Sequence, residues 1–134
     1  MKRTLITLLL ASTMTLCYGY GKKWNTLMDA IIQVESEGNP KAVKGDQVGC
    51  MQIKPILVRD CNRILKLQGS DKRFSLKDRY SIAKSKEMFM LYQSYYNPKG
   101  SIERAIRLWC GGCNYSVRAT QSYYNKVRKQ IRKS

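Results

Sequence analysis

The sequence predicts a predominantly helical α+β domain with one small β-hairpin. Apolar residues recur at intervals of three and four over most of the chain, which is the spacing of amphipathic helices. The segment 43–54 departs from this spacing and contains a turn signal. A length of 134 residues suits one hydrophobic core, and 43% hydrophobic with 25% charged residues excludes a disordered or collagen-like chain.

The first residues are typical of a secretory signal peptide. Lys2 and Arg3 precede an apolar run over residues 4–16, and the small residue Gly19 follows as a cleavage point. The run of about 13 residues is shorter than the roughly 20 that a membrane-spanning helix needs, so a membrane anchor is the weaker interpretation.

We therefore expect a signal peptide over residues 1–19 and a folded domain over residues 20–134. The mature protein is then exported and is periplasmic or extracellular. Lipid attachment at Cys17 is disfavoured, because Leu16 stands where a lipidation signal normally has a small residue.

Two helices and the hairpin are predicted in the first half of the domain. The first helix contains Trp24 and ends near residues 38–40, where Gly-Asn-Pro breaks it, so Glu35 lies at its C-terminal end. In the segment 43–54, residues 44–46 resemble a turn and residues 48–53 are expected to be extended. Pro55, a residue favoured in the first turn, opens the second helix.

Three more helices are predicted in the second half. Ser75 and Asp78 form a capping signal for a long helix to about Tyr96, which residues 97–100 break. Ser101 begins a short helix that ends at the glycine pair 111 and 112. The apolar residues of the segment 115–131 predict a last helix with a very basic outer face.

The charge balance predicts an anionic partner. There are 25 Lys and Arg residues against 9 Asp and Glu, a net charge of +16, which suits cell-wall polymer, anionic lipid or nucleic acid. Export disfavours nucleic acid, and the cations are scattered over several helices. The chain has no histidine, which excludes Ser-His-Asp and Cys-His catalysis and leaves acid–base chemistry to carboxylates.

The cysteines predict disulfides and no metal site. Signal-peptide removal leaves Cys50, Cys61, Cys110 and Cys113, an even number that suits two disulfides of undetermined connectivity in an exported chain. A zinc site would need a second close pair or histidines, and a thioredoxin-like role for residues 110–113 would need a surrounding βαβ pattern. We therefore expect neither a metal nor a cofactor.

Three motifs stand in a characteristic order: residues 35–42 (Glu-Ser-Glu-Gly-Asn-Pro-Lys-Ala), residues 49–55 (Gly-Cys-Met-Gln-Ile-Lys-Pro) and residues 108–112 (Leu-Trp-Cys-Gly-Gly). With the segment 120–127, they resemble the catalytic domain of soluble lytic transglycosylases, a family related in fold to goose-type lysozymes. The resemblance covers roughly residues 24 to 130. It implies a lysozyme-like fold with the hairpin beside a catalytic cleft, and peptidoglycan glycan strands as the partner of an enzyme in a bacterial envelope.

The resemblance implies that Glu35 is the single catalytic residue. As general acid it would protonate the oxygen between N-acetylmuramic acid and N-acetylglucosamine, and as base it would then close a 1,6-anhydro ring. Its place after an apolar stripe, at the negative end of a helix dipole, favours the raised pKa that such an acid needs. By the same resemblance Ser36 steadies the site, Gln52 and Trp109 contact substrate, and Tyr123 reaches back to the catalytic carboxyl.

One departure from the family keeps other functions open. Trp109 and Cys110 stand where the family has Tyr-Asn, and a thiol cannot replace the hydrogen bonds of the amide. A catalytically weak wall-binding module is therefore an alternative, as is a hydrolytic lysozyme that uses Asp46 as a second carboxylate. A membrane-active or nucleic-acid-binding cationic protein is a further alternative. The charge also allows peripheral contact with an anionic envelope surface, and we expect a monomer.

Overall fold

A computed structural model describes residues 21–134, so the predicted signal peptide and Cys17 lie outside the described residues. The described part is mainly helical, with one two-stranded antiparallel sheet, which confirms the predicted class. The first described helix covers residues 21–36. The elements that follow are β1 (Val43–Lys44), β2 (Gln47–Val48), α2 (Pro55–Leu67), the 3-10 helix η1 (Leu76–Tyr80), α3 (Ile82–Tyr96), α4 (Ile102–Gly111) and α5 (Val117–Lys133).

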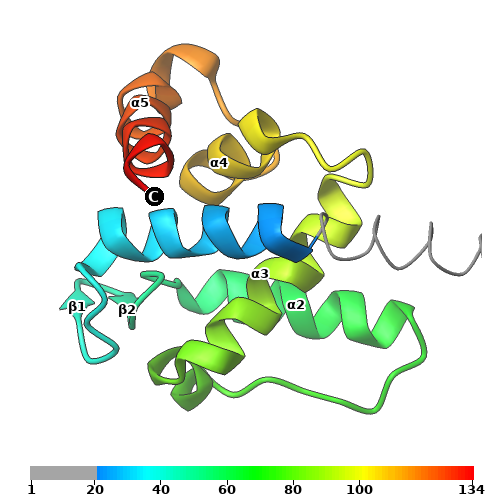
Figure 1. Cartoon of the computed structure of the whole chain (residues 1–134). Helices are drawn as coiled ribbons and strands as arrows, with labels where there is room; N and C mark the ends of the chain where they lie inside the picture. The colour runs from blue at the N-terminus through cyan, green and yellow to red at the C-terminus, as the bar shows by residue number, and fades with distance from the viewer. Residues whose placement is uncertain (1–20) are drawn as a thin grey trace, which may run out of the picture.

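The helix over residues 21–36 forms the centre of the molecule. Figure 1 shows it in blue between two helix pairs, with α4 and α5 on one side and α2 and α3 on the other. Its buried face includes Trp24, Leu27 and Ile31, and the Trp24 ring meets Phe89 of α3 edge to face at 6.1 Å. Removal of these side chains from water stabilises the assembly of the two pairs around this helix.

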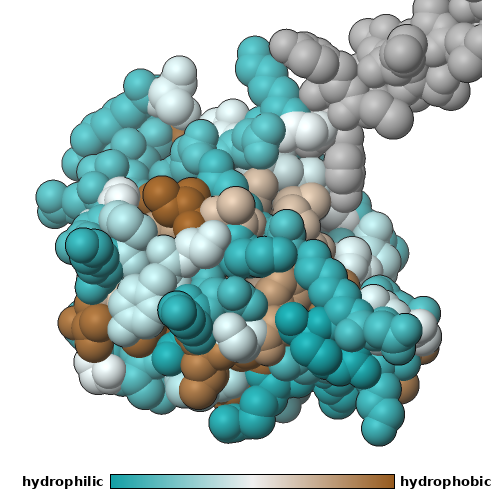
Figure 2. Space-filling view, turned by 90° about the horizontal axis from the view of Figure 1, so that it is seen from below, coloured by the Kyte–Doolittle hydropathy of each residue, from teal (hydrophilic) through white to brown (hydrophobic). Residues whose placement is uncertain are grey.

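Polar side chains cover much of the outside. Figure 2, which looks at the molecule from below the view of Figure 1, shows hydrophilic residues over most of that face and hydrophobic residues in separate spots. No helix among residues 21–134 is both long and apolar enough to cross a membrane.

The segment after α2 differs from the prediction of one long helix from Ser75. Ser75 and Asp78 do form a reciprocal capping box, but they begin only the short helix η1, and Ser81 then caps α3 separately. The guanidinium of Arg79 explains the break, because it is buried and donates hydrogen bonds to the carbonyls of Asp46 and Ile53. The 3-10 helix therefore fastens the hairpin region to the rest of the fold.

The stretch after β2 is a tight loop, and the expectation of an extended segment over residues 48–53 is wrong. Val48 and Ile53 exchange both backbone hydrogen bonds, at 3.2 and 3.0 Å, so the four residues between them must turn back. The turn needs Gly49, whose φ is +84° and whose Cβ, if present, would lie 1.8 Å from the Arg79 carbonyl oxygen. Gln52 adopts a φ of +52° in the same loop, which is rare for a residue other than glycine.

The expected disulfides are absent from residues 21–134, where all four cysteines are free. Cys50 and Cys61 are fully buried, and the Cys61 thiol lies 3.6 Å from the Met88 carbonyl oxygen. Cys110 and Cys113 are exposed at the end of α4. The even cysteine count thus predicted a covalent framework that the fold does not use.

Candidate active site

A cleft of about 760 Å³ runs between the end of the first helix, the hairpin loop, α2 and the C-terminal end of α4. Four of the residues predicted for the site line it: Glu35, Gln52, Trp109 and Tyr123. Ser36, the fifth, lies beside the cleft and is not part of its lining. The fold therefore brings together residues that are up to 88 positions apart in the sequence.

Glu35 lies in the last turn of the first helix, and its carboxyl faces Tyr123. The Tyr123 hydroxyl donates a hydrogen bond of 2.8 Å to Oε1 of Glu35. Oε2 makes no hydrogen bond to any residue in the described part of the chain, so it is available to a ligand. One carboxyl oxygen is thus held in place, while the other makes no hydrogen bond with the described residues, and Glu35 lines the cleft.

The pKa of Glu35 is raised above its ordinary value. Burial is the main cause, because a desolvated carboxyl disfavours its charged form. The hydrogen bond from Tyr123 and the positive charge of Lys44 both lower the pKa, but they do not offset the burial. A carboxyl of this kind keeps a larger protonated fraction near neutral pH than an exposed one, which is what a general acid requires.

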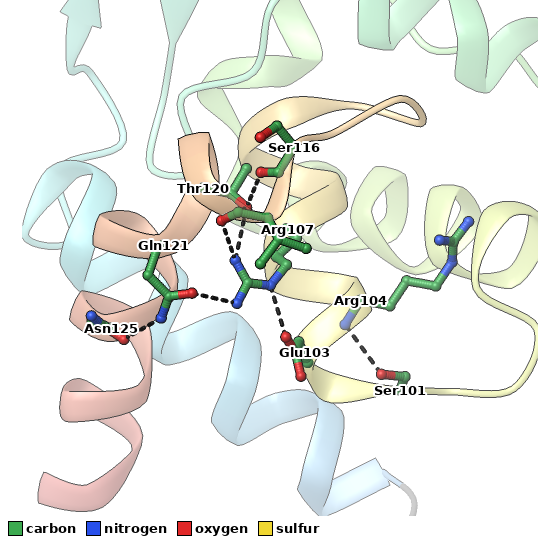
Figure 3. A network of polar contacts seen from close by, with 9 residues as sticks. Ser101, Glu103, Arg104, Arg107, Ser116, Thr120, Gln121 and Asn125 are labelled. Atoms are coloured by element: carbon green, nitrogen blue, oxygen red, sulfur yellow. Dashed lines mark hydrogen bonds and ion pairs between the residues drawn. The ribbon is translucent and has the colours of Figure 1, made fainter.

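Tyr123 owes its position to the close packing of α4 against α5. Arg107 of α4 is 2% exposed, and its guanidinium donates to Glu103, to the Val117 carbonyl, to Thr120 and to Gln121, all at 2.8–2.9 Å. Figure 3 shows Arg107 bound to Glu103 within α4 and to Thr120 and Gln121 of α5.

Gly111 also allows the close packing of α4 against the start of the α5 segment, because a Cβ at this position would lie 2.8 Å from the Tyr115 Cβ. Together these contacts hold α5 so that Tyr123 reaches the first helix.

The loop over residues 49–52 closes the opposite side of Glu35. The Ser36 hydroxyl lies 2.8 Å from the Cys50 carbonyl oxygen and 3.2 Å from that of Ile32, so it joins the helix end to this loop. The Gln52 amide donates to the Ala42 and Gly49 carbonyls at 3.2 and 2.9 Å. These bonds fix the side-chain nitrogen of Gln52 and hold its rare backbone conformation, while the residue still lines the cleft.

Trp109 lines the cleft, and contacts with neighbouring residues hold its ring in place. Its indole nitrogen donates to the Met51 carbonyl at 3.3 Å, and its ring packs edge to face on Phe89 at 5.0 Å and on Tyr92 at 6.2 Å. A half-buried, oriented aromatic ring is suited to packing against the apolar face of a sugar.

Both exposed cysteines line the cleft. The pKa of the Cys110 thiol is raised by burial and next by the charge of Glu35, while Lys54 lowers it. The Cys113 sulfur lies 3.6 Å from the Tyr92 hydroxyl. Cys110 therefore presents a neutral thiol near Glu35, at the position where the family resemblance leads one to expect an amide.

Sequence reasoning missed the contribution of α2 to the site. Arg59, Asp60 and Arg63 line the cleft from this helix. The apolar periodicity that predicted this helix also identifies its buried face. The charged residues between those apolar positions were therefore the available sign that the opposite face of the helix could line a cleft. Arg107 carried no such signal, because arginine in an amphipathic helix is normally solvated.

The comparison with known families agrees with this geometry. A family model described as the transglycosylase SLT domain matches residues 18–131, which is most of the chain. The chain belongs to this family. A search among characterised proteins found no match.

Membership confirms the resemblance drawn from the three motifs. The SLT domain supports peptidoglycan cleavage of the lytic transglycosylase type and glycan strands as the partner, in a family typical of exported cell-wall enzymes. No group of three or more potential metal ligands is present among residues 21–134.

Proposed function

We propose that this SLT domain protein is an exported lytic transglycosylase that cleaves the β-1,4 bond between N-acetylmuramic acid and N-acetylglucosamine, with Glu35 as acid and then base. The observation that carries the proposal is the desolvated Glu35 carboxyl, which lines the cleft and is held by Tyr123 through one oxygen. The segment over residues 1–19, which would direct export, remains a prediction from sequence.

The reaction follows from the two states of this carboxyl. Protonated Glu35 gives its proton to the glycosidic oxygen as the bond to the muramyl C1 breaks. The resulting carboxylate then accepts the proton of the muramyl C6 hydroxyl, whose oxygen bonds to C1 and closes the 1,6-anhydro ring. Glu35 ends protonated, so one residue completes the cycle, as microscopic reversibility allows.

The other carboxylates of the cleft region favour this single-acid scheme over hydrolysis. Asp60 is the other carboxylate among the described residues that line the cleft, and it is bound by Arg63 at 2.7 Å and by the Tyr96 hydroxyl at 2.6 Å. Asp46, the residue that the lysozyme alternative would use, is exposed in the hairpin turn and does not line the cleft. A carboxylate held in an ion pair is poorly suited to activate a water molecule.

The test is mass spectrometry of the soluble products from peptidoglycan incubated with the mature protein. We expect anhydromuropeptides, and a rate about 10²–10⁴-fold lower for Glu35→Gln, because loss of a general acid–base typically costs this much. Glu37→Gln is the matched control, since this exposed carboxylate two residues away does not line the cleft.

Other products would redirect the assignment. Reducing-end muropeptides from the wild-type protein would make it a lysozyme. Absence of any product, together with retained binding to peptidoglycan, would favour the wall-binding module.

A further inference from the structure

The α2 side of the cleft carries positive charge that the catalytic scheme does not use. Lys54, Arg59 and Arg63 all line the cleft. Arg63 is bound to Asp60 and to the Tyr96 hydroxyl, at 2.7 Å each, and lies 5.3 Å from the Tyr95 ring centroid. Its charge is therefore already balanced by that of Asp60.

Lys54 and Arg59 are different. Both side chains are exposed, and neither makes a hydrogen bond or ion pair with any residue of the part that the structure describes. Two unbalanced cations therefore stand on one wall of a substrate cleft.

The helical register directs this charge into the cleft. Val58, Cys61, Ile64 and Leu65 of α2 are buried against the core. Ile56, Arg59, Asp60 and Arg63 fall on the other side, at spacings of three and four residues, and all line the cleft. The packing that anchors α2 thus leaves its charged face beside the substrate.

Lys54 lines the same cleft as Glu35. Its charge and that of Glu35 both act on the Cys110 thiol, in opposite directions. Arg59 stands five positions later, about 7 Å further along at the helical rise of 1.5 Å per residue. Both cations therefore line the cleft that holds Glu35, at separate positions on its α2 side.

A glycan backbone offers these cations little, because its hydroxyl and acetamido groups are neutral. The negative charges of peptidoglycan are carboxylates on its substituents, either on the lactyl group of N-acetylmuramic acid or on the attached peptide. Lysine and arginine bind carboxylates by charge-assisted hydrogen bonds.

We propose that Lys54 and Arg59 form a carboxylate-binding site that recognises the acidic substituents of a glycan strand lying in the cleft. The site gives the enzyme a preference for charged strands and sets their register relative to Glu35. This inference rests on the proposed function, because it takes the glycan to be the occupant of the cleft.

The experiment measures binding, so that it does not depend on turnover. A Glu35→Gln background carries either the pair Lys54→Gln and Arg59→Gln or the control pair Lys126→Gln and Lys129→Gln. The control pair removes the same charge from exposed positions on α5 outside the cleft. Each protein is titrated with solubilised strands that bear peptides, with strands stripped of peptides, and with strands whose carboxylates are converted to methylamides.

We expect the cleft pair to weaken binding of the carboxylate-bearing strands by about three- to thirtyfold at low salt, the range for two exposed ion pairs. Binding of the methylamide strands should not change, and added salt should reduce the difference. A loss confined to peptide-bearing strands assigns the peptide carboxylates, and a loss that includes the stripped strands assigns the lactyl carboxylate.

Equal losses for charged and methylamide strands, or equal losses from the cleft and control pairs, would overturn the inference, as would no loss at all. The proposed function fails separately, if the protein with Glu35 intact binds the strands as described but releases no product.

Discussion

The α4–α5 side of the cleft and the α2 side treat their charged residues in opposite ways. Arg107 lies between α4 and α5 with its side chain 3% exposed, and it satisfies its guanidinium within the protein. On α2, Arg59 is exposed, lines the cleft and forms no ion pair with the described residues.

The difference separates two tasks. Buried and fully paired, Arg107 joins the helices that carry Trp109 and Tyr123 and so keeps the surroundings of Glu35 fixed and poor in water. Exposed charge on α2 keeps its hydration until a ligand arrives, so it is suited to recognition. The α4–α5 side depends on packing, and the α2 side depends on charge.

The largest expected effect comes from Arg107→Ala. The substitution leaves a cavity and removes one hydrogen bond within α4 and three from α4 to α5, so we expect the free energy of unfolding to fall by about 2–5 kcal/mol. Glu103→Gln removes the other partner of the same ion pair, whose side chain is 54% exposed, and should cost less than about 1 kcal/mol. Urea denaturation measures the unfolding free energy of both variants. Similar losses of unfolding free energy in Arg107→Ala and Glu103→Gln would contradict the conclusion that the buried guanidinium holds α4 against α5.

The sequence predicts those parts of the fold that depend on local signals. The start of α2 at Pro55 was predictable, and so were the start of α4 after Ser101 and its end at the glycines 111 and 112. Each of these signals acts on the backbone within a few residues of its own position. The predicted site residues came from the motifs, and the hydrogen bond from Tyr123 to Glu35 agrees with the expectation that this tyrosine reaches the carboxyl.

Contacts made at long range were not predictable. The buried Arg79 divides the expected helix by bonding to the carbonyls of Asp46 and Ile53. These partners lie 33 and 26 positions away in the sequence, so no local pattern could predict the break. Nothing within a window of a few residues distinguishes such an arginine from a solvated one. The free cysteines follow the same rule, since an even count says nothing about which side chains the fold brings together.

A medium effect is expected for Tyr123→Phe. The hydroxyl donates to Glu35, and hydrogen bonds to charged groups contribute about 1.5–3 kcal/mol, so the variant should lose this much stability at neutral pH. The bond lowers the pKa of Glu35, so its loss raises that pKa further, and Glu35 stays protonated to higher pH.

The alkaline limb of the kcat/KM profile should therefore move to higher pH in Tyr123→Phe. Tyr124→Phe is the control, because this neighbouring tyrosine packs its ring under Arg107 and makes no bond to Glu35. An unchanged limb, or a shift to lower pH, would show that the Tyr123 hydroxyl does not govern the titration of Glu35.

The smallest effect is expected for Ser36→Ala, which tests the connection between the helix over residues 21–36 and the loop over residues 49–52. The variant loses the hydroxyl donor of the Cys50 carbonyl, at 2.8 Å in a partly buried place, while alanine favours the helix slightly more than serine. A net loss of about 0.5–1.5 kcal/mol in unfolding free energy should follow, with an unchanged urea dependence.

Ser94→Ala provides the matched comparison for Ser36→Ala, because the Ser94 hydroxyl bonds only to the Leu91 carbonyl, three residues away on the exposed surface of α3. Its bond joins no separate segments and competes with water, so we expect a change within about 0.5 kcal/mol. If Ser36→Ala were equally mild and left the rate unchanged, the loop would be held by Gln52 and Trp109 instead. A lower rate with modest loss of stability would show that the serine acts by positioning Glu35, the residue that directly precedes it in the same helical turn.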